Sequence, residues 1–222
     1  MNLKFDPQTG LIPAIAQDRL SGELRMVAYM NQLALDQTLR TGFATFFSRS
    51  RNSLWVKGET SGNRLKVARV VADCDADVVL LLVDAEGPSC HTGRQNCFFH
   101  EVGSDGQLQE QAESCTPTLT ELERTILART RSTGEKSYTR YLLDAGIPKI
   151  NEKIREEAGE LIQALSSESD ERVANEAADL LFHMCVGLRS RGVDLAAVLG
   201  VLAARTGKSG HEEKRSRKPS PG

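Results

Sequence analysis

The hydrophobic positions divide the chain into two parts with different periodicity. Between residues 1 and 103, short apolar or alternating segments are separated by glycine-containing turns, a pattern typical of β-strands. The expected strands cover 11–16, 43–47, 54–57, 65–72, 78–83 and 98–102. Residues 24–40 are rich in Ala, Leu, Met and Gln, which favour helices, so a helix is expected there. The first part is therefore predicted to be β-rich.

From residue 118 onward, the apolar residues follow helical spacing. The expected helices cover 118–131, 138–144, 148–166, 170–191 and 194–207. Thr118 opens a candidate capping box, and Asp170 and Asp194 are candidate N-caps. Gly146 is expected to stop the second helix, and Pro148 is tolerated in the first turn of the third. This part is predicted to be entirely helical.

A polar stretch with Gly and Ser separates the two parts, as expected of a linker. The sequence thus predicts an α+β protein with a β-rich domain over 1–103, a linker over 104–117 and an all-α helical-bundle domain over 118–222. The basic segment 209–218 either helps to hold substrate or a second subunit, or is a frayed end; the last residues are expected to be disordered.

Composition narrows the function classes. Charged residues make up 26% and hydrophobic residues 40% of the chain, as in ordinary globular proteins. The net charge of −2 implies no broad basic surface, which disfavours a nucleic-acid partner. The longest aliphatic run, 78–83, is too short for a membrane span, and the N-terminus lacks a signal-peptide core, so a cytoplasmic protein is expected. Its five cysteines are then expected to be thiols or metal ligands.

Metal-ligand residue types are concentrated between residues 73 and 97. They are Asp73, Cys74, Asp75, Asp77, Cys90, His91 and Cys97. On an extended strand the three aspartates point to one side and Cys74 to the other, unless the chain bends. Carboxylates suit Mg²⁺, and thiolates suit Zn²⁺. Alternatively, the cysteines are small buried hydrophobes and the acids line a solvated turn.

Longer motifs favour the metal sites. The segments 26–31, 48–62, 73–77 and 90–98 closely resemble phosphoribosyl-AMP cyclohydrolases. The resemblance implies that a zinc ion is bound by Cys74, Cys90 and Cys97, with one cysteine from a different subunit of a homodimer than the other two. It also implies a magnesium ion bound by Asp73, Asp75 and Asp77. The reaction implied is attack of zinc-activated water on adenine C6, which breaks the N1–C6 bond.

Further residues of the same motifs are candidates for catalysis or substrate binding. His91 is a candidate general acid or base, or only orients a neighbour. Arg49, Arg51 and Lys57 have the charge to bind phosphates, although most such residues serve solubility. Trp55 either stacks on the purine or belongs to the core.

Two expected helices each carry a charged stripe. The first stripe is Lys153, Glu156, Glu157 and Glu160, and the second is Arg172, Glu176, Asp179 and His183. Residues three or four apart share a helix face, and acids beside an apolar face can project into a cleft between packed helices. The alternative is an exposed acidic face with basic residues nearby.

This acid spacing resembles the all-α nucleoside triphosphate pyrophosphohydrolases. More narrowly, the segments 137–160, 175–183 and 205–218 resemble phosphoribosyl-ATP pyrophosphohydrolase. The resemblance implies Mg²⁺ ligands at Glu156, Glu157, Glu160, Glu176 and Asp179, of which Glu156 is not required by the four-acid motif. It implies phosphate contacts from Lys149 and Lys153. Mg²⁺ then bridges carboxylates and triphosphate, and Glu160 is the candidate base for the attacking water.

The two implied reactions are consecutive, because phosphoribosyl-AMP is the product of the second part and the substrate of the first. The sequence therefore predicts a homodimeric, bifunctional hydrolase of histidine biosynthesis that uses Zn²⁺ and Mg²⁺ and acts on small nucleotides, without nucleic-acid or membrane partners. Two alternatives remain. Only the helical part is active, on ordinary nucleotides, or zinc is structural and the helices form an interaction module.

Overall fold

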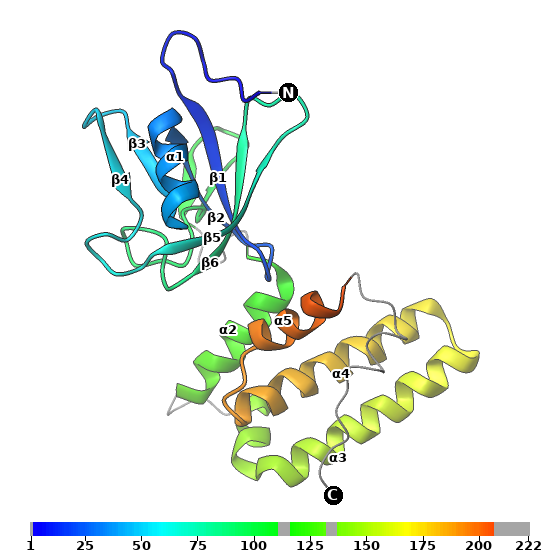
Figure 1. Cartoon of the computed structure of the whole chain (residues 1–222). Helices are drawn as coiled ribbons and strands as arrows, with labels where there is room; N and C mark the ends of the chain where they lie inside the picture. The colour runs from blue at the N-terminus through cyan, green and yellow to red at the C-terminus, as the bar shows by residue number, and fades with distance from the viewer. Residues whose placement is uncertain (1, 111–115, 132–136, 207–222) are drawn as a thin grey trace, which may run out of the picture. The chain divides into compact units, whose positions relative to one another are not determined.

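The computed structural model describes residues 2–110, 116–131 and 137–206 (Figure 1). The chain falls into two compact units, Met1–Pro117 and Thr118–Gly222. The first unit is rich in strands, and the described residues of the second form only helices and their connections, so the predicted α+β class is confirmed. The basic segment 209–218 and the expected disorder of the tail fall outside the described residues.

A four-stranded mixed sheet forms the centre of the first unit. Its strands lie in the order β2 (Leu24–Met30), β1 (Ile12–Asp18), β6 (Val79–Ala85) and β5 (Leu65–Ala72). The central strands β1 and β6 are parallel, whereas each outer strand pairs antiparallel with its neighbour. Burial alternates along β1 and β6, so one face of the sheet carries the core.

The helix α1 (Gln32–Thr41) and two hairpins complete this unit. Buried side chains of α1 and of β3 (Thr45–Ser48) belong to the same core as the sheet. The strand β3 pairs antiparallel with β4 (Ser53–Val56). The second hairpin joins β7 (His100–Val102) to β8 (Leu108–Glu110). All six predicted strands are present, and β8 lies within the segment predicted to be a linker.

The helix predicted over 24–40 is wrong in its first half, which forms β2 instead. The backbone of β2 pairs with β1 in a register that places Met30 opposite Ile12, and both side chains are fully buried. Helix propensity is a weak preference that such pairing overrides. The helix begins only after Asn31, whose side-chain oxygen accepts a hydrogen bond from the amide of Ala34 at 2.9 Å.

The second unit consists of α2 (Thr118–Arg131), α3 (Tyr138–Ser167), α4 (Asp170–Ser190) and α5 (Leu195–Arg205). The helices α3 and α4 lie side by side as an antiparallel pair (Figure 1). Ile126, Ile150 and Val186 bring α2, α3 and α4 into one core. Gly187 allows the close approach of α3 and α4, because a Cβ there would lie only 3.3 Å from Cγ2 of Ile150.

The helix boundaries agree with the prediction, with differences at three points. The helices predicted over 138–144 and 148–166 form one element that is kinked at Gly146, where φ is 80°. The N-cap of α4 is Ser169 rather than Asp170. Asp194 occupies the N-cap position of α5 without a capping side-chain bond, and its carboxylate instead pairs with Arg189 at 2.7 Å. Within the described residues, no helix has both the length and the apolarity that a membrane span needs.

Candidate active sites

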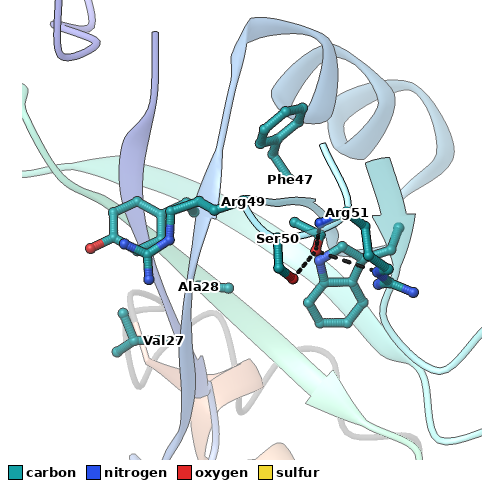
Figure 2. A pocket seen from close by; sticks show the side chains of 9 residues that line it. Val27, Ala28, Phe47, Arg49, Ser50 and Arg51 are labelled. Atoms are coloured by element: carbon teal, nitrogen blue, oxygen red, sulfur yellow. Dashed lines mark hydrogen bonds between the residues drawn. The ribbon is translucent and has the colours of Figure 1, made fainter. Parts of the chain in front are cut away.

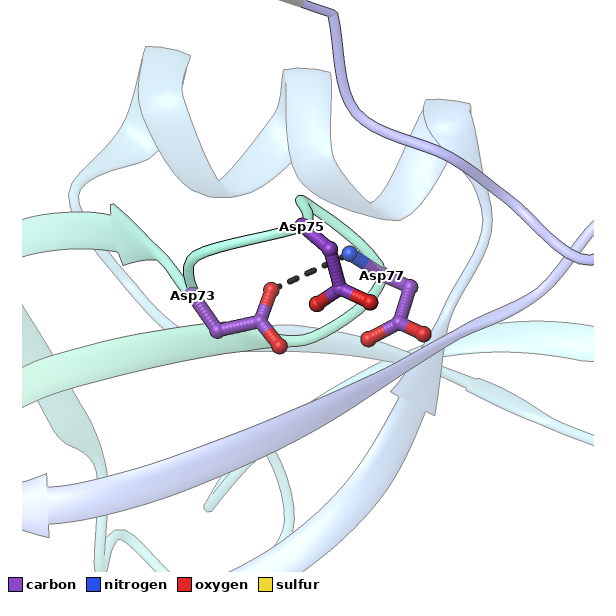
Figure 3. A group of neighbouring side chains, drawn as sticks. All are labelled: Asp73, Asp75 and Asp77. Atoms are coloured by element: carbon purple, nitrogen blue, oxygen red, sulfur yellow. Dashed lines mark hydrogen bonds between the residues drawn. The ribbon is translucent and has the colours of Figure 1, made fainter.

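The three predicted magnesium ligands of the first unit converge in the turn between β5 and β6. One carboxylate oxygen each of Asp73, Asp75 and Asp77 lies within 4.8 Å of the others, and Figure 3 shows the three carboxylates close together in this turn. Of the two arrangements that the sequence allowed, an extended strand or a bend, the structure has the bend, which lies at Ala76, where φ is 64°. The Asp73 carboxylate stabilises the bend by accepting hydrogen bonds from the backbone amides of Asp77 at 3.0 Å and Val78 at 3.1 Å.

The negative charges of the three carboxylates in this turn repel one another. The hydrogen bond from the backbone of Val78 is the main cause that holds the pKa of Asp73 below its ordinary value. The negative charge of Asp75, above all, raises the pKa of Asp77. A divalent cation with oxygen ligands would relieve this repulsion, so the donor set fits Mg²⁺.

Two of the three predicted zinc ligands meet in the loop that follows β6. Cys90 and Cys97 line the same cavity and are close enough for each thiol to influence the pKa of the other, and the Thr92 hydroxyl lies 3.1 Å from the Cys90 sulfur. Cys74 instead lies in the aspartate turn, with its sulfur 4.0 Å from a carboxylate oxygen of Asp75. Over the described ranges, no third metal-ligand side chain joins the two thiols. Two thiols are half of the four ligands that a tetrahedral zinc ion takes.

The protonation of the two thiols differs. Burial raises the pKa of Cys97 to about 11, although part of this residue reaches the surface. Burial acts in the same direction on Cys90, but interactions with Thr92, Cys97 and His91 together hold the pKa of Cys90 below its ordinary value. Nearby, desolvation lowers the pKa of the Lys57 ammonium, although the charges of both cysteines oppose this.

The cysteines open into a cavity of about 470 Å³ that is also lined by most of the catalytic and substrate-binding residues predicted in the first unit. His91, Arg51, Trp55 and Lys57 all line it. The Nδ1 atom of His91 lies 3.8 Å from the Cys90 sulfur, within reach of anything bound there. The fold thus brings residues that are up to 46 positions apart, Arg51 to Cys97, into one cavity.

Arg49 lies in a neighbouring open hollow of about 840 Å³, for which Arg51 and Trp55 also provide part of the lining. Figure 2 shows Arg49 and Arg51 at opposite sides of this hollow, with Ser50 between them. The Arg49 guanidinium lies over the ring of Tyr29, 4.2 Å from its centre. Trp55 also packs on the buried ring of Phe46, as expected of a residue that belongs to the core, while its predicted stacking on the purine stays a prediction.

The predicted acids of the second unit meet between α3 and α4. Oxygens of Glu157, Glu176 and Asp179 lie within 4.8 Å of one another, and the first two residues are buried. Glu160 is close enough to Glu176 to raise the pKa of its carboxyl group. Glu156 is exposed and pairs with Lys153 at 2.7 Å. The helical stripes therefore face each other as predicted, with Glu156 at the edge.

Basic residues partly neutralise this acidic cluster. Lys153 lies 3.2 Å from Glu157, and Arg172 lies 2.6 Å from Glu176. Burial is the largest effect on Glu176 and raises its pKa, against the charge of Arg172. Lys149 is one turn before Lys153 and pairs with the exposed Glu152 at 2.6 Å. Buried carboxylates of this kind need cations, and their oxygen donors fit Mg²⁺.

Two protein families match the chain on either side of residue 118. Phosphoribosyl-AMP cyclohydrolase matches residues 26–99, and phosphoribosyl-ATP pyrophosphohydrolase matches residues 119–206. The histidine biosynthesis bifunctional protein HisIE of Wolinella succinogenes is 44% identical over 215 residues, which are 95% of this chain and 94% of that protein. The chain belongs to the HisIE family. The proteins of the same name from Bacillus subtilis and Deinococcus radiodurans are 45% and 42% identical, over 91% and 94% of this chain and 94% of each relative.

Membership of the HisIE family confirms both resemblances seen in the sequence. A HisIE chain is a bifunctional hydrolase of histidine biosynthesis, with a cyclohydrolase part followed by a pyrophosphohydrolase part. The cysteine cavity and the aspartate turn lie within the cyclohydrolase match. The acidic cluster of α3 and α4 lies within the pyrophosphohydrolase match.

Two polar networks in this HisIE chain were not predicted as parts of a site. In the helical unit, Nδ1 of the buried His183 donates to the Asp179 carbonyl at 2.9 Å, which leaves Nε2 to accept from the Tyr138 hydroxyl at 3.1 Å. His183 belongs to the acidic stripe, so its spacing was the available signal. In the first unit, Glu23 and Arg25 form a buried ion pair at 2.7 Å. No motif marks this pair, and Arg25 lay within the helix predicted over 24–40.

Proposed function

We propose that this chain hydrolyses phosphoribosyl-ATP to phosphoribosyl-AMP and pyrophosphate in its helical unit, and then opens the adenine ring of phosphoribosyl-AMP in its β-rich unit. The observation that carries the proposal is the presence of two chemically different ligand clusters, each inside the matching family segment. The first unit holds a pair of thiols and, separately, a turn of three carboxylates, whereas the second unit holds carboxylates alone. This difference corresponds to Zn²⁺ with Mg²⁺ in the first unit and to Mg²⁺ in the second.

In the helical unit, Glu157, Glu160, Glu176 and Asp179 would hold Mg²⁺, which would neutralise the triphosphate and draw charge from the bond that breaks. Glu156 can bind the same Mg²⁺ only when its ion pair with Lys153 breaks. Lys153 and Lys149 project from successive turns of α3 and would contact the phosphates. Glu160 is exposed, unlike Glu157 and Glu176, and would take the proton of the attacking water. The oxygen of the water then bonds to the α-phosphorus, and pyrophosphate leaves.

In the β-rich unit, Cys90 and Cys97 would hold zinc, which when bound lowers the pKa of water from about 15.7 to about 7. His91 would receive a proton from the attacking water and return it to N1. The oxygen bonds to adenine C6, and the N1–C6 bond breaks. Trp55 would stack on the purine, and Arg49, Arg51 and Lys57 would hold the phosphates.

We further infer a cytoplasmic homodimer. Cys74 is not near the other two thiols within one chain, so a second copy would supply this ligand while the aspartate turn binds Mg²⁺ beside it. Free thiols that must stay available for metal need a reducing compartment. Neither reaction calls for a nucleic-acid or membrane partner.

The experiment that tests the proposal follows both products from one substrate. Chelated full-length protein with Mg²⁺ and phosphoribosyl-ATP should release pyrophosphate and accumulate phosphoribosyl-AMP. Adding Zn²⁺ should then start ring opening. ATP, which lacks the ribosyl group on N1, should be a poor substrate. Equal turnover of ATP, or no turnover of either compound in metal-loaded protein, contradicts the proposal.

A further inference from the structure

A buried ion pair at the start of β2 lies beside the loop that carries the cysteines. Arg25 and Glu23 pair at 2.7 Å, with only 6% and 1% of their side chains exposed. Two charges are removed from water here, which costs several kcal/mol per ion unless their remaining hydrogen-bonding groups are satisfied. The arrangement of these remaining bonds indicates what the pair does.

The Arg25 guanidinium reaches both sides of the cysteine loop. Its Nε donates to the Ser89 hydroxyl at 3.0 Å, and Nη2 donates to the Gly87 carbonyl at 2.8 Å. The same Nη2 also donates to the side-chain oxygen of Gln95 at 3.4 Å. Because the planar guanidinium presents its donors in a fixed fork, it sets the separation of the two loop segments that it contacts.

Glu23 completes the arrangement from the other side of the ion pair. Its second carboxylate oxygen accepts from the Asn96 amide at 2.7 Å. Ser89 directly precedes Cys90, and Asn96 directly precedes Cys97. Each partner of the ion pair therefore contacts the residue before one of the two thiols. The backbone repeats this connection, since the Cys97 amide donates to the Arg25 carbonyl at 3.0 Å.

Stability alone does not account for such a pair. Well-packed apolar residues at a buried ion pair often give equal or greater stability. The location of the pair beside the cysteine loop does account for its presence, because a zinc site needs its sulfur atoms at a fixed separation before the metal binds. Groups that orient metal ligands without touching the metal commonly change metal affinity by about 10–100-fold when they are substituted.

We propose that Glu23 and Arg25 are positioning residues that hold Cys90 and Cys97 at the separation required by a metal ion. They act through Ser89, Asn96 and the loop backbone, and they contact neither metal nor substrate. This inference rests on the proposed zinc site. It adds a requirement at the start of β2, outside the cysteine loop.

The test is the zinc affinity of the full-length protein, measured by competition with a chromogenic chelator. The double variant Glu23→Gln/Arg25→Met leaves no unpaired buried charge and should bind zinc about 10–100-fold more weakly than the native protein. Arg25→Lys keeps the charge but loses the fork and should also bind weakly. The control is Arg19→Met, which removes the half-exposed pair Arg19–Asp84 in the same unit and should leave zinc affinity unchanged.

Cobalt provides a second readout that folding alone does not change. Co²⁺ bound through correctly placed thiolates gives strong visible bands that report tetrahedral sulfur coordination. These bands should weaken in the double variant while circular dichroism stays native. If the double variant does not fold, Asn96→Ala keeps the ion pair, removes one of its connections and should still weaken zinc binding.

The outcomes separate this inference from the proposed function. Native zinc affinity in Cys90→Ala refutes the zinc site itself. Loss of zinc in Cys90→Ala, with native affinity and cobalt bands in a folded double variant, refutes only the positioning role. Recovery of native affinity in Arg25→Lys also refutes it, because charge alone would then be sufficient.

Discussion

The Arg172 guanidinium lies 2.6 Å from the carboxylate of Glu176, one turn further along α4. Glu176 is almost fully buried, whereas Arg172 is half exposed. Arg172 therefore supplies positive charge to the acidic cluster. Binding of Mg²⁺ at Glu176 would compete with Arg172 and leave its guanidinium available for the triphosphate.

The raised pKa of Glu176 predicts how stability depends on pH. Its ordinary pKa is 4.5 and the folded value is higher, so between the two the folded protein holds more protons than the unfolded chain. Stability from this group is present below pH 4.5 and is lost as pH rises through the folded pKa. In metal-free protein at pH 7, Glu176→Gln should therefore unfold at a higher temperature than the native protein.

Magnesium should reverse that order. Mg²⁺ should raise the unfolding midpoint of the native protein at pH 7, because it binds the ionised carboxylates of the folded state, and should have a smaller effect on Glu176→Gln. Glu171→Gln is the matched control, because Glu171 is an exposed acid in the first turn of α4. Equal magnesium effects in all three proteins contradict the cation site.

Zinc binding should release protons and therefore strengthen with pH. At neutral pH the Cys97 thiol, whose pKa is about 11, carries a proton that zinc must displace. Each proton released per zinc makes the affinity about tenfold stronger per pH unit. Chelator competition at pH 6, 7 and 8 measures this slope. A pH-independent affinity would show that Cys97 is not a ligand, and Cys185→Ala is the control with an unrelated buried thiol.

The Tyr138 hydroxyl should matter for pyrophosphate release. It holds His183, whose Nδ1 lies 3.7 Å from a carboxylate oxygen of Glu157. Tyr138→Phe keeps the ring contacts with Phe182 but loses a hydrogen bond worth about 0.5–1.5 kcal/mol. We expect the rate of pyrophosphate release to fall by roughly 2–10-fold, as that energy implies. Tyr141→Phe, on the neighbouring exposed ring, should be neutral; equal rates in both variants would exclude the role of His183.

The close approach at Gly187 predicts a stability difference between two glycines. A side chain at Gly187 would meet Ile150 at 3.3 Å and Ile154 at 3.5 Å, so Gly187→Val should destabilise the protein by about 1–3 kcal/mol. Gly200 of α5 has no atom within 4 Å of an added Cβ. Gly200→Ala should stabilise by about 0.5–1 kcal/mol, because Ala favours helix. Chemical denaturation measures the free energy of unfolding of both variants. Equal changes in the two variants would contradict the close packing at Gly187.

The sequence was most informative where local spacing determines geometry. The acids of α3 and α4 recur at helical spacing, so their convergence could be predicted once the two helices packed together. The aspartates also converge, but through the bend at Ala76 rather than along a strand, because alternation alone does not show where a strand ends.

The errors arise from long-range pairing. Residues 24–30 have helical composition, yet β1 offers a pairing edge that composition does not reveal. For the same reason, the contacts of Arg25 with Ser89, 64 positions away, could not be predicted from local sequence. The resemblance implied that one of the three cysteines comes from a different subunit than the other two, and Cys74 lies apart from Cys90 and Cys97 within one chain; the subunit that supplies it stays a prediction.

The most direct test of two separate hydrolytic sites supplies phosphoribosyl-ATP, Mg²⁺ and Zn²⁺ to two variants, alone and mixed. Cys90→Ala should release pyrophosphate and stop at phosphoribosyl-AMP, whereas Glu160→Ala should release almost no pyrophosphate and still open the ring of added phosphoribosyl-AMP. An equal mixture should convert phosphoribosyl-ATP to the ring-opened product. Ring opening by Cys90→Ala alone would contradict the account.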